Sequence, residues 1–104
     1  MAETRLISVI GQKHAGKTTL ALALAAEFVR KGRRVMTIKH ARQPVEVDRP
    51  GSDSYRLFHE GKSERTLVVG PGLHALFARH SEEGDPVTLA RQYLEGADLV
   101  LVEG

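Results

Sequence analysis

The sequence has no cysteine, few aromatic residues and no strong excess of charge of one sign, and each shortage excludes a class of protein. Without cysteine, the 104 residues carry neither a disulfide framework nor a thiolate metal site. Fifteen basic and 13 acidic residues leave a net charge of +2, too weak to indicate nucleic acid, and no basic stripe with interleaved aromatics is present. No apolar run approaches the ~20 residues of a membrane helix. Neither nucleic acid nor a membrane is therefore expected as a partner.

The overall composition is that of a small globular domain. Hydrophobic residues make up 41% and charged residues 27% of the chain, which is ordinary for a soluble protein. The N-terminus shows no charged-then-apolar signal pattern. We expect a single cytoplasmic domain over residues 1–104. The last apolar run stops where the functional loops of an α/β sheet begin, which predicts that these residues are part of a longer native chain, truncated at the C-terminus.

One motif dominates the chain. Gly11-Gln12-Lys13-His14-Ala15-Gly16-Lys17-Thr18 matches G-x-x-x-x-G-K-[ST], the phosphate-binding P-loop. Its glycines let backbone N–H groups point toward an anion, Lys17 can reach the β- and γ-phosphates, and the Thr18 hydroxyl can ligand Mg²⁺. An ordinary glycine-rich turn is the alternative. The strand-like run before the motif and the helical pattern after it argue against that alternative.

The remaining pattern predicts an α/β fold, namely a three-layer P-loop NTPase fold with a mostly parallel sheet and a β-hairpin. Leu6–Ile10, as an almost wholly apolar run, is expected to be an inner strand. Residues 73–79 form the second strand of the hairpin or, alternatively, a short helix. The expected elements are strands over 6–10, 34–39, 66–69, 73–79 and 99–102, and helices over 19–30, 54–60 and from Asp85-Pro86.

Two carboxylates are candidates for a magnesium site. Glu103 ends an apolar strand beside the expected P-loop, where a Walker B residue holds a magnesium-bound water, or it only caps nearby N–H groups. Asp48 lies in the loop that leaves the second strand, at the sheet edge where ligands bind, or it is only a turn residue. Asp53 or Ser52 can equally cap the next helix.

Four stretches in this order and spacing resemble the MobB family, the adapter proteins of molybdopterin-guanine dinucleotide biosynthesis. The stretch with Asp-x-Pro-Gly-x-Asp-Ser-Tyr is the most specific of them. They are Gly-Gln-Lys-His-Ala-Gly-Lys-Thr-Thr-Leu (11–20), Thr-Ile-Lys-His (37–40), Asp-Arg-Pro-Gly-Ser-Asp-Ser-Tyr-Arg (48–56) and Asp-Leu-Val-Leu-Val-Glu-Gly (98–104).

The resemblance implies a GTP-binding homodimer with at most weak GTPase activity. It would assist the guanylyltransferase that attaches GMP to the molybdenum cofactor. Residues Gly11 to Thr19 would bind phosphates, Thr18, Asp48 and Glu103 would lie near Mg²⁺, and Asp53-Ser54 would shape the loop that faces the nucleotide. The competing hypotheses are a small P-loop kinase or synthetase of the dethiobiotin synthetase type, and a basic interaction module with a vestigial P-loop.

Overall fold

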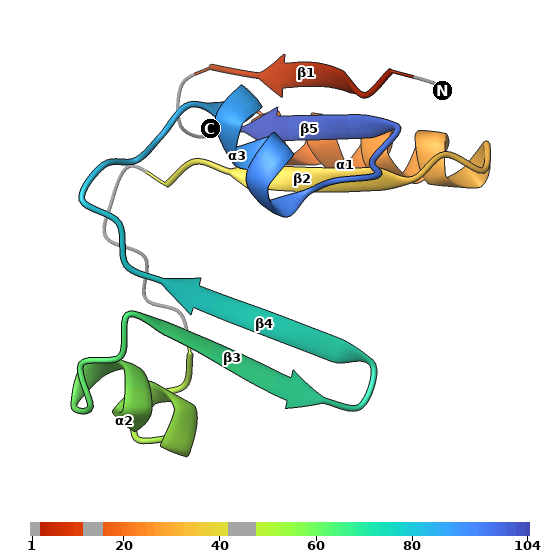
Figure 1. Cartoon of the computed structure of the whole chain (residues 1–104). Coiled ribbons are helices and arrows are strands. Elements are labelled where there is room, and N and C mark those ends of the chain that lie inside the picture. The colour runs from red at the N-terminus through yellow and green to blue at the C-terminus, as the bar shows by residue number, and fades with distance from the viewer. Residues whose placement is uncertain (1–2, 12–15, 42–47) are drawn as a thin grey trace. The chain divides into compact units, whose positions relative to one another are not determined.

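A computed structural model describes residues 3–11, 16–41 and 48–104 (Figure 1), and the chain clusters into two compact units. The first unit combines residues 1–44 with 84–104, and the second spans residues 45–83. The expectation of one domain over residues 1–104 remains a prediction. Within the described ranges, no helix is long and apolar enough to span a membrane.

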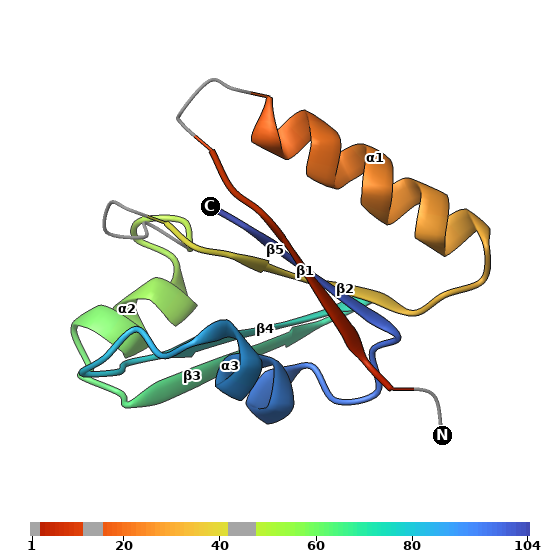
Figure 2. The same cartoon turned by 90° about the horizontal axis from the view of Figure 1, so that it is seen from above.

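The first unit is a parallel sheet with a helix on each face. Its strands are β1, β5 and β2, with β5 in the middle (Figure 1), and α1 and α3 lie on opposite faces of this sheet (Figure 2). These three layers confirm the predicted α/β class. The elements are β1 (Arg5–Val9), α1 (Lys17–Arg30), β2 (Val35–Lys39), α3 (Pro86–Tyr93) and β5 (Leu99–Glu103).

The core of this unit is built on β5. Val100 and Leu101 are fully buried, and because successive strand residues face opposite sides, they serve different helices. Val100 and Val102 pack with Ala97 under α3. Leu101 and Glu103 line a cavity together with Ala21 and Ala25 of α1.

The position of β1 corrects a prediction. Leu6 to Ile10 was expected to be an inner strand, but in the described sheet β1 is an edge strand and β5 is the inner one. All five residues of β5 are buried, whereas only Val9 of β1 is. The physical reason lies in the side chains: β1 carries Arg5 and Ser8, which favour water on at least one face, whereas Leu99 to Val102 are uninterrupted apolar residues.

The second unit is a hairpin covered by one helix. It contains α2 (Asp53–His59), β3 (Arg65–Gly70) and β4 (Leu73–Ala78), and the two strands pair antiparallel with Leu67 opposite Leu76. The hairpin prediction for residues 73–79 is therefore confirmed, and the helical alternative is wrong. The Arg79 guanidinium stacks over the Phe58 ring at 4.1 Å and donates to the Phe58 carbonyl at 2.5 Å, which fastens α2 to the hairpin.

Candidate functional site

The end of β1 and the start of α1 frame the phosphate-loop motif. Gly16 is the N-cap of α1 and has a left-handed backbone (φ 84°), which glycine adopts without strain. The predicted site residues Gln12, Lys13, His14 and Ala15 lie outside the described residues, while Gly11 and Gly16 flank them.

The first turn of α1 offers backbone donors to a ligand. Gly16 has no side chain, so no cap side chain accepts from the N–H groups of this turn. Free N–H groups and the positive end of the helix dipole make such a terminus attractive to anions. Lys17 is half-buried here, and Thr18 and Thr19 are exposed. The Gly-Lys-Thr end of the motif thus begins α1, as the phosphate-loop pattern predicts.

Glu103 lies beside this turn, as the Walker B hypothesis requires. β5 pairs directly with β1, and Glu103 is in register with Val9, the last residue of β1. The prediction that the strand of Glu103 neighbours the P-loop strand is confirmed. Glu103 is only 9% exposed, and its Oε1 atom is buried without a hydrogen-bond partner among the described residues.

Lys39 contacts the same carboxylate, although no motif in the sequence marks it as a site residue. Lys39 ends β2 and is in register with Glu103, and its Nζ atom lies 2.7 Å from Glu103 Oε2. The position of Lys39 in the sequence was the available indication, because Lys39 and Glu103 each stand at the end of an expected parallel strand. Only the strand order, with β5 next to β2, turns that position into a contact.

The surroundings of Glu103 keep it ionised. The hydrogen bond from Lys39 is the largest influence and lowers the pKa of this carboxyl, while burial acts in the opposite direction. The charges of Lys39 and Lys17 lower the pKa further, and the Thr18 hydroxyl adds a smaller lowering. The Glu103 carboxylate, Lys17 and Thr18 are therefore close enough to influence one another.

Backbone contacts hold this edge of the sheet together. The His40 N–H donates to the Glu103 carbonyl at 2.8 Å, and the Gly104 N–H donates to the Val9 carbonyl at 3.3 Å. A Cβ atom at Gly104 would lie 2.4 Å from the His40 carbonyl oxygen, so this position requires glycine. The Val-Glu-Gly sequence thus brings the carboxyl ends of β1, β5 and β2 close together and positions Glu103 between them.

A small cavity opens at the same edge. It has a volume of about 160 Å³, and its lining includes Thr18, Lys39 and Glu103 together with Ala21 of α1. A water molecule takes about 30 Å³ in the liquid, so the cavity has room for a few waters or a hydrated cation next to the Glu103 carboxylate.

The other predicted site residues belong to the second unit. Asp48 accepts from the Ser54 hydroxyl and from the Arg49 N–H at 2.8 Å, and these bonds, that of Ser54 foremost, lower its pKa. Ser52, not Asp53, is the N-cap of α2, with its Oγ accepting from the Tyr55 N–H at 3.2 Å. Asp48 thus shapes the turn before α2, and its approach to a metal stays a prediction.

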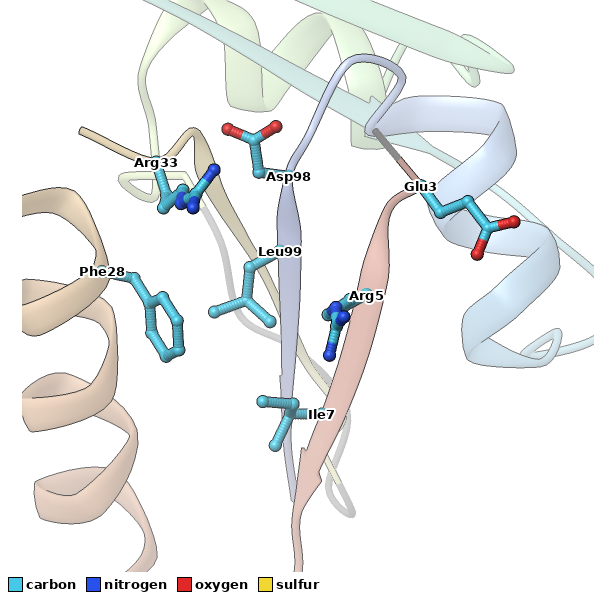
Figure 3. A pocket seen from close by; sticks show the side chains of 7 residues that line it. All are labelled: Glu3, Arg5, Ile7, Phe28, Arg33, Asp98 and Leu99. Atoms are coloured by element: carbon cyan, nitrogen blue, oxygen red, sulfur yellow. The ribbon is translucent and has the colours of Figure 1, made fainter. Parts of the chain in front are cut away.

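A second cavity in the first unit lies at the opposite end of the sheet. It measures about 560 Å³ and opens between α1 and the amino ends of β1 and β5, with Phe28, Ile7 and Leu99 facing one another across it (Figure 3). Its charged lining is balanced, with two arginines and two carboxylates. Since β1 leads to the phosphate loop at its other end, this cavity is not part of the candidate site.

The fold and the site define a class. A parallel sheet between two helices, a glycine-initiated helix bearing Lys17 and Thr18, and an acidic residue ending the neighbouring strand are the features of the P-loop NTPase-like α/β fold. Comparison with known families specifies the class further. The family model described as "Molybdopterin guanine dinucleotide synthesis protein B" matches residues 6–104, and the chain belongs to this MobB family.

Individual relatives agree with the family match. The molybdopterin-guanine dinucleotide biosynthesis adapter protein of Haemophilus influenzae is 36% identical over 103 residues, covering 95% of this chain and 56% of the relative. The Escherichia coli adapter protein is 39% identical over 92 residues, covering 86% and 52%. The chain therefore spans about half the length of the curated relatives it matches.

Solved structures show the same fold. A crystal structure of molybdopterin-guanine biosynthesis protein B matches 95% of this chain and 60% of its own with a TM-score of 0.74 and 28% identity. The MobB homologue of Bacillus stearothermophilus matches all of this chain and 56% of its own with a TM-score of 0.62 and 32% identity.

Proposed function

We propose that the chain binds GTP with Mg²⁺ at the start of α1 and acts as an adapter for the guanylyltransferase that attaches GMP to the molybdenum cofactor. The observation that carries the nucleotide site is the buried Glu103 carboxylate, which has one unpartnered oxygen and lies beside Lys17 and Thr18. The adapter role is supported by its relatives, which are named as adapter proteins and are about twice as long as this chain.

The residues present fit a hydrated divalent cation. The described part of the chain contains no cluster of three or more His, Cys, Asp or Glu side chains that would hold a metal by themselves. Mg²⁺ does not need such a cluster, because it keeps several waters and binds through one or two protein oxygens and the substrate phosphates. Thr18 and Glu103 would supply those oxygens, and Asp48 is a further ligand that the sequence predicts. The cation, when bound, would neutralise phosphate charge.

The environment of Glu103 favours binding over turnover. Hydrolysis requires a group that positions or deprotonates the attacking water. Glu103 is the acidic residue that the described part of the chain places beside Thr18, and its lowered pKa makes it a poor proton acceptor. This supports at most weak GTPase activity, which suits an adapter better than a kinase or synthetase.

The hairpin of the second unit is the surface we propose for a homodimer. Leu67, Val69 and Leu76 lie on one face of β3 and β4 and are 58%, 65% and 44% exposed. Exposed apolar side chains on a two-stranded sheet with open edges favour association with another chain. A second copy of this chain would cover this face.

Nucleotide-dependent thermal stability tests the binding site. With GTP and Mg²⁺ at a hundredfold the dissociation constant, the wild type should gain about 2.7 kcal/mol of stability. Lys17→Ala should gain almost nothing, because it lacks the ammonium that neutralises phosphate charge. Lys31→Ala, which removes a lysine at the other end of α1, is the matched control and should respond like the wild type.

Equal nucleotide-dependent shifts for wild type and Lys17→Ala would refute the site. The same titration with ATP tests the guanine preference, and a smaller shift with ATP is expected. Co-purification with the guanylyltransferase tests the adapter role separately. If the chain binds GTP but forms no complex with that enzyme, the nucleotide site stands and the adapter role is refuted.

A further inference from the structure

The Lys39–Glu103 ion pair occupies the carboxylate that the proposed function assigns to the cation. The Lys39 Nζ and Glu103 Oε2 atoms are 2.7 Å apart, at the carboxyl ends of neighbouring parallel strands. The two side chains differ in their access to water: that of Lys39 is 62% exposed, whereas that of Glu103 is 11% exposed. The carboxylate is therefore fixed within the sheet edge, and the ammonium approaches it from the solvent side.

The ion pair engages only one of the two oxygens of the Glu103 carboxylate. Glu103 Oε1 is buried and has no hydrogen-bond partner among the described residues. A buried acceptor without a partner is costly, and such groups in folded proteins call for an explanation such as a functional role or a bound ion or water. The cavity that Glu103, Lys39 and Thr18 line supplies the space for an additional ligand.

A lysine is suited to leave such a pair. Its ammonium is a compact, strongly hydrated point charge on a flexible four-carbon stem, and the Lys39 side chain is 62% exposed, so water can solvate the ammonium once it leaves the carboxylate. A metal cation that binds the Glu103 carboxylate more strongly than the Lys39 ammonium does can therefore displace it. Lys17 also lies close enough to lower the pKa of Glu103, so a Lys39 ammonium displaced from the carboxylate would add to positive charge already present beside the phosphate loop.

We propose that Lys39 is a positioning residue that acts as the resident counter-cation of Glu103 and passes from this carboxylate to the phosphates when a cation–nucleotide complex binds. This inference rests on the proposed function. Its consequence is selectivity: Lys39 opposes binding of a divalent cation alone, because the two compete for Glu103, and supports binding of the cation together with a triphosphate. Cation and nucleotide then bind cooperatively, and by linkage each strengthens the other by the same factor.

A purely structural ion pair makes a different prediction. It would stabilise the junction of β2 and β5, and its loss would lower the melting temperature without changing the affinity for a cation. The exposed side chain of Lys39 and the unpartnered Oε1 atom favour the positioning role, because a buried carboxylate in a structural ion pair repays its desolvation only when its remaining oxygen is also hydrogen-bonded.

Manganese binding measured by electron paramagnetic resonance separates these roles. Lys39→Met should bind Mn²⁺ alone about two- to fivefold more tightly than the wild type, the range that a partly exposed ion pair supports. Adding GTP should raise the Mn²⁺ affinity of Lys39→Met by a smaller factor than it raises the Mn²⁺ affinity of the wild type. Lys39→Arg retains the charge and should restore the weak binding of Mn²⁺ alone.

Two further variants control the experiment. Lys31→Met removes one positive charge at the far end of α1 and should behave as the wild type. Lys39→Met combined with Glu103→Gln should lose the tighter Mn²⁺ binding, because the carboxylate itself is gone. Melting curves without ligand report whether each variant is folded, and Lys39→Arg gives a second reading if Lys39→Met is unstable.

Three outcomes are informative. Tighter Mn²⁺ binding and reduced coupling in Lys39→Met, both reversed in Lys39→Arg, would support the inference. Unchanged Mn²⁺ affinity and unchanged coupling in a folded Lys39→Met would overturn it while the proposed function stands. A wild type that binds neither Mn²⁺ nor GTP would overturn the proposed function and this inference with it.

Discussion

At the scale of single residues, short polar side chains define where the helices begin. Asp85 is the N-cap of α3: its Oδ1 atom accepts from the Thr88 N–H at 2.9 Å, and its Oδ2 atom accepts from the Thr88 hydroxyl at 2.8 Å. Pro86 follows at the first helical position, where its missing N–H is not needed. The two bonds to Thr88, that of the backbone foremost, hold the pKa of Asp85 below its ordinary value.

This cap makes the stability of α3 depend on acid. Because the pKa of Asp85 is lower in the folded than in the unfolded state, the carboxylate contributes stability that is present above about pH 4, its ordinary pKa. That contribution is lost as the pH falls through the lowered folded-state value. Asp85→Asn keeps a capping oxygen but does not titrate, so its free energy of unfolding should fall less steeply than that of the wild type below about pH 4.

Urea denaturation at a series of pH values measures this difference. Glu82→Gln removes an exposed carboxylate of the preceding loop and should keep the wild-type pH dependence. Identical acid profiles for Asp85→Asn and the wild type would show that the Thr88 bonds do not bias the protonation of Asp85.

Residue-level predictions from sequence succeed where the interaction is local. The start of α3 follows from Asp85-Pro86 alone, because the Asp85 cap and its donor residue, Thr88, are three residues apart. The contact between Lys39 and Glu103 was missed because it joins residues far apart in the chain. Glu103 was recognised from its place after an apolar strand, whereas Lys39 looked like an ordinary polar strand end.

At the scale of elements, β5 organises the first unit. It pairs with β1 on one side and β2 on the other, and two of its side chains, Val100 and Leu101, are fully buried. Since Glu103 ends this strand, the packing of β5 also sets the position of the site carboxylate. Core stability and site geometry therefore depend on the same five residues.

Truncation of a buried leucine in β5 should be costly, whereas the same truncation at an exposed position of α1 should not be. Leu101 is 1% exposed, so Leu101→Ala should lower the free energy of unfolding by about 2–5 kcal/mol through lost burial and the remaining cavity. Leu22 is 66% exposed, and Leu22→Ala should change the free energy of unfolding by no more than about 0.5 kcal/mol. Equal losses in urea denaturation would contradict the central position of β5.

Element boundaries followed from pattern, but element positions did not. The helix of α1 was predicted from Leu20, Leu24 and Phe28, yet Leu20 is 52% exposed in the structure. Helical spacing identifies an apolar stripe several residues wide, and only contact with the sheet decides which residues of that stripe are buried. The edge position of β1 was missed for a related reason, since strand order depends on long-range pairing.

At the scale of the whole molecule, association through the hairpin is the property to test. If Leu67 and Leu76 lie in an interface between two copies, Leu67→Lys should yield a monomer, because it places a charge in a dehydrated apolar contact. Light scattering should give a dimer mass for the wild type. Leu57→Lys, at a 61% exposed position of α2 in the same unit, should remain dimeric.

A wild type that stays monomeric at high micromolar concentration would contradict the dimer proposal. A Leu67→Lys variant that remains dimeric would move the interface away from this face of β3 and β4.

The central claim is that a cation–nucleotide complex binds where α1 begins and β5 ends. Crystals grown with a GTP analogue and Mn²⁺ locate the cation directly through its anomalous signal. We expect the metal to touch the Thr18 hydroxyl, with the Glu103 carboxylate bound directly or through one of its waters, and the sequence predicts Asp48 as a further ligand. A metal whose shell, including its waters, touches neither carboxylate would contradict this account.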